Sequence, residues 1–168
     1  MFRRVVATTF VLLLSACAHN PPPAHKTIII PAGAERGYDD YHYAPAMRVG
    51  DTVVVSGIPA ARGATYEEKV RNMFERLKGV LAAAGADLGD VIEIDTFHAQ
   101  AADTAAFKAE FARFVAIHRD YFPDHYPAWT AVGVTALLAE GAVVEMRVTA
   151  VIGAGKSAEV RRANPPKP

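Results

Sequence analysis

Cysteine is almost absent from this 168-residue chain, which contains only Cys17. An internal disulfide needs two cysteines, and Cys17 precedes the part of the chain that the sequence patterns predict to fold. We therefore expect neither a disulfide framework nor a thiol nucleophile in the domain.

An excess of charge of one sign is also missing, because 18 Lys and Arg residues balance 18 Asp and Glu residues. A neutral chain lacks the electrostatic field that would gather nucleic acid or an anionic membrane surface. No basic patch interleaved with aromatic residues is present either. We expect no nucleic-acid partner.

Several catalytic signatures are absent as well. The chain has no Gly-x-Ser-x-Gly elbow, phosphate loop or dinucleotide fingerprint, which argues against serine hydrolases, NTPases and Rossmann enzymes. Its histidines lack metal-ligand spacing with one another or with carboxylates: His19, His25, His42, His98, His118 and His125. We predict no metal site, a buried structural role for His118, and leave His98 without a role.

The N-terminal residues are typical of a secretory signal. Arg3 and Arg4 precede an apolar run over residues 5–14, which is shorter than the roughly twenty residues that span a bilayer. Residues 14–17, Leu-Ser-Ala-Cys, resemble the bacterial lipobox, so residues 1–16 are predicted to be a lipoprotein signal peptide and Cys17 the lipidated residue. An ordinary cleaved signal with a coincidental cysteine remains the alternative. Ala18 favours the outer membrane by resemblance to Gram-negative sorting rules, with the domain facing the periplasm.

Proline-rich segments flank the expected domain. Residues 17–36 include three consecutive prolines and are predicted to form an extended tether. Residues 155–168 combine charges and prolines without apolar periodicity, which indicates a disordered tail. The folded domain is therefore predicted over residues 37–154.

Within that domain, the first elements are a strand and a helix. Residues 52–56 are rich in valine and end at Gly57, which indicates a strand. Thr65 and Glu68 have the spacing of a capping box, and Gly85 is expected to end the helix that begins there. That helix carries an apolar stripe that must pack on a sheet, formed by Val70, Met73, Phe74, Leu77, Val80 and Leu81.

The same order repeats. Residues 91–98 predict a strand with Ile92, Ile94, Thr96 and His98 on one side, and Asp103 can cap a helix with a second stripe of Phe107, Phe111, Phe114, Val115 and His118. Residues 144–152 alternate between an apolar row and the polar row Glu145, Arg147 and Thr149. We expect an α+β fold with both helices on one sheet face and hairpin-like closing strands.

Four short motifs occur in an order that resembles the Rid family, the reactive intermediate deaminases. They are Tyr43, the Thr-Val-Val-Val-Ser-Gly run of residues 52–57, Pro-Ala-x-Thr at 127–130, and Val-Glu-Met at 144–146. The resemblance implies a chorismate-mutase-like fold with a mixed sheet and a homotrimer whose sheets enclose a barrel. It also implies ligand sites in clefts between subunits, no cofactor, and hydrolysis of small enamines or imines.

The resemblance further implies roles for individual residues. Glu145 would position the water that attacks an imine carbon. The substrate would lie against Tyr43, Ser56, Gly57, Trp129 and Ala131. In the deaminating branch the position of Trp129 is an arginine that binds the substrate carboxylate, and an indole cannot replace that bidentate fork.

Alternatives remain for these residues. Arg147 is a candidate for the missing positive charge, but Glu145 and Arg147 can equally be a solvated surface pair. Ser56 and Gly57 can be a plain strand-end turn, and Trp129 can fill the core or line an aromatic pocket. A small-molecule-binding trimer without catalytic activity is the alternative function.

Overall fold

The computed structural model describes residues 25–99 and 101–163. The predicted signal peptide, Cys17 and the three consecutive prolines lie outside these residues. Within the described part of the chain, no helix is long and apolar enough to cross a membrane.

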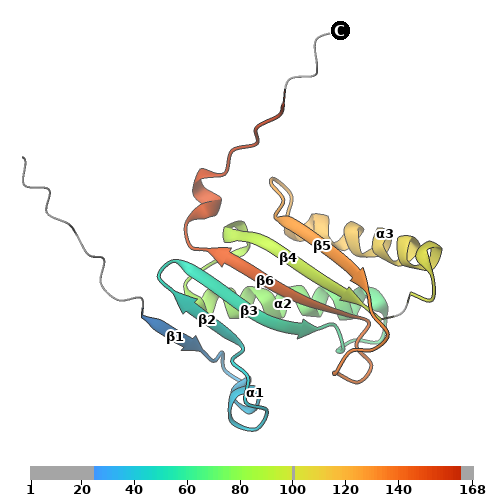
Figure 1. Ribbon diagram of the computed structural model, residues 1–168, viewed down its shortest axis with the longest axis horizontal. Helices are drawn as coiled ribbons and strands as arrows, with labels where there is room; N and C mark the ends of the chain where they lie inside the picture. The colour runs from blue at the N-terminus through green and yellow to red at the C-terminus, as the bar shows by residue number, and fades with distance from the viewer. Residues whose placement is uncertain (1–24, 100, 164–168) are drawn as a thin grey trace, which may run out of the picture.

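One six-stranded sheet organises the chain (Figure 1), with the strand order β1-β2-β3-β6-β4-β5. Neighbouring strands are antiparallel except β4 and β5, which are parallel. The strands are β1 (Lys26–Ile29), β2 (Ala46–Val49), β3 (Thr52–Pro59), β4 (Val91–His98), β5 (Ala128–Gly133) and β6 (Val144–Val151). The expected hairpin of closing strands is wrong, because β6 lies between β3 and β4 while β5 occupies the sheet edge.

Both long helices, α2 (Tyr66–Ala84) and α3 (Thr104–Tyr121), lie on one face of the sheet. The predicted α+β fold is thereby confirmed. The remaining elements are short: α1 (Glu35–Asp39) and the 3₁₀ helices η1 (Leu88–Asp90) and η2 (Ala154–Ser157).

The helix ends follow the sequence signals. The Thr65 hydroxyl accepts a hydrogen bond from the Glu68 backbone N–H at 3.2 Å, and the Glu68 carboxylate accepts one from the Thr65 N–H at 3.2 Å. Gly85 ends α2 in the left-handed region with φ of 84°, which favours glycine. Asp103 caps α3 by accepting a hydrogen bond from the Ala106 N–H at 2.8 Å. These predicted boundaries are confirmed.

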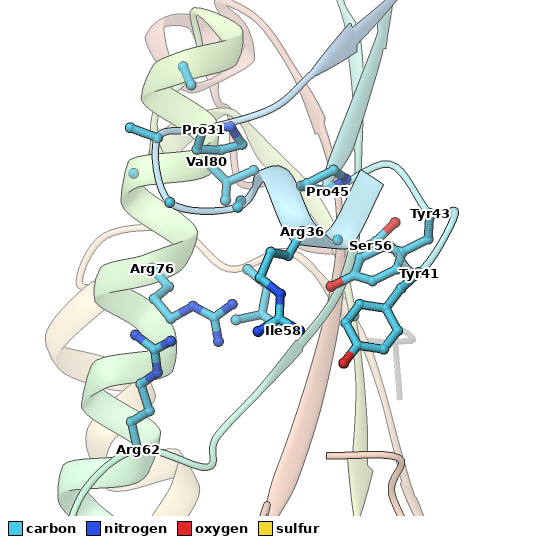
Figure 2. Close-up of a pocket in the computed structure, with 17 residues that line it drawn as sticks. Pro31, Arg36, Tyr41, Tyr43, Pro45, Ser56, Ile58, Arg62, Arg76 and Val80 are labelled. Carbon is cyan, nitrogen blue, oxygen red and sulfur yellow. The ribbon is translucent and has the colours of Figure 1, made fainter. Parts of the chain in front are cut away.

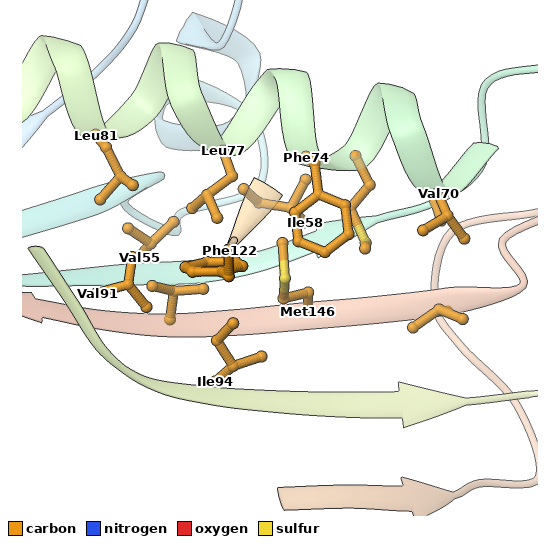
Figure 3. Packing of buried hydrophobic residues seen from close by; sticks show 14 of the residues in the cluster. Val55, Ile58, Val70, Phe74, Leu77, Leu81, Val91, Ile94, Phe122 and Met146 are labelled. Atoms are coloured by element: carbon orange, nitrogen blue, oxygen red, sulfur yellow. The ribbon is translucent and has the colours of Figure 1, made fainter. Parts of the chain in front are cut away.

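The core lies between α2 and the sheet (Figure 3). Phe74 and Leu77 from α2 are fully buried against Val55, Ile94 and Met146 from three different strands. Full burial of side chains of this size stabilises the fold by about 1.5–3 kcal/mol each. Because alternate residues of β6 point into this core, Glu145, Arg147 and Thr149 lie on the face without helices.

One face assignment in β4 is wrong. Ile94, Thr96 and His98 are buried on the helix side, but Ile92 is exposed. A register shift between Val91 and Glu93 interrupts the alternation at Ile92.

The predicted domain boundaries are too narrow at both ends. Residues 26–29, assigned to the tether, form β1, because their β-branched side chains suit a strand that pairs with β2. Residues 35 and 36 of that tether begin α1. At the other end, residues 155–157 of the predicted tail belong to η2, and Asp90 Oδ1 accepts hydrogen bonds from the N–H groups of Gly153 at 2.9 Å and Gly155 at 3.2 Å.

Candidate functional site

A pocket of about 720 Å³ lies between α1, β3 and α2 (Figure 2). Three predicted substrate-binding residues, Tyr43, Ser56 and Gly57, line it together. The Ser56 hydroxyl donates a hydrogen bond to the Ala44 carbonyl at 2.7 Å, so its proton is already used within the protein. The Tyr43 ring lies against Gly37 of α1, where an added Cβ would come within 3.1 Å of the ring.

Glu145 lies next to Gly57, which lines this pocket. Its side chain does not line the cavity, but a Cβ added to Gly57 would collide with the Glu145 carboxylate. A β-bulge between Val55 and Ile58 in the β3–β6 pairing brings Gly57 to this position. Glu145 is half-buried, and within the described residues its carboxylate has no hydrogen bond or ion pair. It is available to bind a water molecule or a ligand.

Arg147 has a different partner. Its guanidinium lies 3.2 Å from Asp95 on the neighbouring strand, on the sheet face without helices. The Arg147 side chain is 46% exposed, so the pair contributes less than about 1 kcal/mol to stability. Within one chain, Arg147 therefore pairs with Asp95 rather than Glu145.

Trp129 and Ala131 lie on the helix side of the sheet, away from Arg147. The Trp129 indole stacks on His118 at 4.6 Å between ring centroids and contacts Phe111 at 4.9 Å. Its N–H donates a hydrogen bond to the Thr96 hydroxyl at 3.0 Å, and Thr96 is opposite Ala131 in the β4–β5 register. Within one chain, Trp129 packs on the core and does not share the pocket of Tyr43 and Ser56. Within one chain, Arg147 lies on the opposite face of the sheet and does not bring a positive charge to the position of Trp129.

A buried polar network continues from Trp129 and was not predicted from the sequence. His98 contacts Thr96 at 3.0 Å and Glu110 at 3.1 Å, and the Tyr66 hydroxyl donates to the same Glu110 oxygen at 3.1 Å. Burial, followed by the Glu110 charge, raises the pKa of Tyr66. A signal was present, because Glu110 falls within the aromatic stripe of α3, three residues after Phe107.

His118 is buried, as predicted, but within the described residues its Nε2 has no hydrogen-bond partner. Burial lowers its pKa from 6.5 to about 4. The ring is therefore neutral at neutral pH and acts as a flat packing partner of Trp129.

The pocket also contains arginines that the sequence interpretation did not include. Arg36, Arg62 and Arg76 extend into it (Figure 2). Partial burial and, to a lesser extent, the charge of Arg62 lower the pKa of Arg76. In contrast to this cationic lining, no group of three or more His, Cys, Asp or Glu side chains in the described residues is arranged to hold a metal ion.

The fold and this pocket define a class of small α+β proteins, and comparison with known proteins gives the family. The family model described as Endoribonuclease L-PSP matches residues 38–152. The chain therefore belongs to this family, which includes the Rid proteins, and the predicted resemblance is confirmed.

Similarity to individual relatives supports this family assignment. The RutC family protein YjgH of Escherichia coli is 33% identical over 118 residues, which cover 67% of this chain and 86% of the relative. A 2-iminobutanoate/2-iminopropanoate deaminase of Dermatophagoides farinae is 29% identical over 117 residues, covering 66% and 85% respectively.

Solved structures show the same fold. A structure of protein YJGH aligns with a TM-score of 0.65 and 33% identity, covering 76% of this chain and 96% of that one. Rv2704 of Mycobacterium tuberculosis, a member of the YjgF/YER057c/UK114 family, aligns with a TM-score of 0.65 and 26% identity, covering 76% and 100%.

Proposed function

We propose that this protein hydrolyses small 2-imino acids, and their enamine tautomers, to 2-keto acids and ammonia. The observation that carries the proposal is the Glu145 carboxylate, which is half-buried, without a partner in the described residues, and adjacent to Gly57 of the pocket. A relative named 2-iminobutanoate/2-iminopropanoate deaminase supports the choice of reaction.

The reaction needs one base that then acts as an acid. Glu145 accepts a proton from water while the water oxygen bonds to the imine carbon, and the resulting carbinolamine carries the former imine nitrogen as an amine. For a substrate that enters as the iminium ion, Glu145 then returns this proton to the amine nitrogen. As the C–N bond breaks and ammonia leaves, the carbinol hydroxyl gives its proton to Glu145 and becomes the keto oxygen. A carboxylate without a hydrogen-bond or ion-pair partner in the described residues suits this role, because its oxygens can accept a hydrogen bond from the attacking water.

The test is hydrolysis of 2-iminobutanoate generated in situ. We expect Glu145→Gln to lower kcat/KM by about 10²–10⁴-fold, the usual contribution of a general acid–base group. Gly57→Ala should lower it as well, because the new Cβ displaces the carboxylate. Glu140→Gln, at an exposed carboxylate, and Gly133→Ala, where an added Cβ meets nothing within 4 Å, are the matched controls.

A wild-type rate in Glu145→Gln would refute the proposal. The second candidate, ligand binding without catalysis, is favoured by the packed indole at position 129. It predicts saturable binding of a ligand together with wild-type turnover no greater than that of Glu145→Gln.

We also propose that the protein assembles as a homotrimer through the sheet face without helices. Val49 on β2 and Val132 on β5 are exposed on that face, and association would bury them. Sedimentation equilibrium should give about three times the chain mass of 18.0 kDa. A mass equal to one chain would contradict the trimer.

Lipidation of Cys17 and a periplasm-facing position at the outer membrane are proposed from the sequence alone. Cys17→Ser should move the protein from the membrane fraction to the soluble fraction. An unchanged distribution would rule out the anchor.

A further inference from the structure

The pocket is strongly cationic in its lining. Its 17 lining residues include three arginines and no aspartate or glutamate. Arg36 comes from α1, Arg62 from the segment between β3 and α2, and Arg76 from α2, and their guanidinium groups extend toward the same space beside Ile58 (Figure 2).

Two of these arginines have no ion-pair partner in the described part of the chain. Arg36 pairs with Asp40 at 3.0 Å in an exposed position. Within residues 25–99 and 101–163, neither Arg62 nor Arg76 forms an ion pair, and Arg76 makes only a long contact of 3.5 Å to the Pro59 carbonyl.

By comparison, another arginine of the same helix as Arg76 has an ion-pair partner. Arg71, also on α2, lies 2.7 Å from Asp120. Two like charges directed into one partly enclosed pocket repel each other, and a bound anion would remove that repulsion. Arg62 and Arg76 therefore favour an anionic ligand in the pocket.

The remaining lining limits the size and kind of that anion. Ile58 and Val80 supply apolar surface, and the aromatic side chains of Tyr41 and Tyr43 border the cavity. A volume of about 720 Å³ falls in the range of small-molecule sites. A charged head group with a short apolar chain fits these walls better than a bare inorganic ion.

We propose that Arg62 and Arg76 bind the carboxylate of a small 2-imino or 2-oxo acid in this pocket. The identity of the acid rests on the proposed function, whereas the carboxylate site rests on the pocket itself. A guanidinium donates two parallel N–H bonds to a carboxylate, so two arginines can hold both oxygens. With the head group held there, the carbon chain lies against Ile58 and Val80.

The experiment is calorimetric titration of the full chain with 2-oxobutanoate. We expect Arg62→Gln and Arg76→Gln each to weaken binding by about tenfold or more, and the double variant to show no saturable binding. Arg119→Gln, which removes an exposed arginine of α3 outside the pocket, is the matched control and should bind like wild type. Neutral butan-2-one should not bind.

Folding is monitored in the same samples. Loss of either pocket arginine relieves repulsion, so Tm should not fall, and 2-oxobutanoate should raise the Tm of wild type but not of Arg76→Gln. Wild-type affinity in both single variants, or no binding to wild type, would overturn the proposal. Inorganic phosphate binding more tightly than 2-oxobutanoate, with the same dependence on both arginines, would replace the carboxylate by phosphate.

Failure of the carboxylate site and failure of the proposed function would give different experimental results. Arginine-dependent binding of 2-oxobutanoate without hydrolysis of 2-iminobutanoate would leave the carboxylate site standing and refute the proposed function. Hydrolysis by wild type with binding that is indifferent to both arginines would do the reverse.

Discussion

Replacing Trp129 by arginine tests whether a positive charge at this position can serve the site. The family resemblance alone suggests that Trp129→Arg restores a carboxylate-binding residue and raises turnover. The structure leads us to expect the opposite, because the indole stacks on His118 and its N–H binds Thr96 on the helix side of the sheet.

The expected magnitude follows from what the indole contacts. Truncating a buried Trp costs about 3–5 kcal/mol, and the Trp129 side chain is half-buried, while an arginine stem recovers some packing. We therefore expect Trp129→Arg to lower the free energy of unfolding by about 2–4 kcal/mol and Tm by roughly 10 °C. Imine hydrolysis should not increase.

Urea unfolding followed by far-UV circular dichroism measures this loss, since the only tryptophan is removed. Trp129→Phe is the matched variant: it keeps an aromatic ring but loses the hydrogen bond to Thr96, and should cost about 1 kcal/mol. Unchanged stability of Trp129→Arg together with faster hydrolysis would refute the reasoning and place residue 129 in the catalytic cleft of the assembled protein.

Two further predictions concern the same side of the sheet. Burial lowers the pKa of His118 in the folded protein to about 4, so below pH 6.5 the unfolded chain binds a proton that the folded chain does not. The free energy of unfolding should therefore fall by about 2 kcal/mol between pH 7.5 and pH 5. His118→Phe should be less pH-sensitive than wild type by that amount, and parallel pH curves would contradict this. Thr96→Val leaves His98 Nε2 without its partner and should cost about 2 kcal/mol in urea unfolding, whereas Thr96→Ser should cost under 1 kcal/mol; equal losses would contradict a hydrogen-bond role.

The elements of the fold could be predicted from local patterns. Thr65 with Glu68, Gly85 and Asp103 marked helix ends because capping depends on neighbouring backbone groups. The alternation in β6 predicted which side chains face the core, because strand geometry fixes it. The pairing of β6 between β3 and β4 could not be predicted in this way, since it depends on residues far apart in the chain.

The candidate site was predicted less completely for the same reason. Tyr43, Ser56 and Gly57 meet in one pocket, but Trp129 lies on the core side, which the alternation within β5 alone could not reveal. Arg62 precedes α2 and was not singled out, because nothing local to it indicates a pocket. Its meeting with the other arginines arises from the packing of α1 and α2 beside β3.

The positions of Trp129 and the pocket arginines have related physical causes. Arginine in place of the stacked indole would bring a charge into an aromatic cluster, so the core disfavours it. At the pocket, Arg62 and Arg76 are solvated on one side and can keep their charges at a modest cost in repulsion. An anion cancels that repulsion only while bound. The place that tolerates these cations is therefore also the place where a carboxylate gains most, in a pocket that Gly57 also lines.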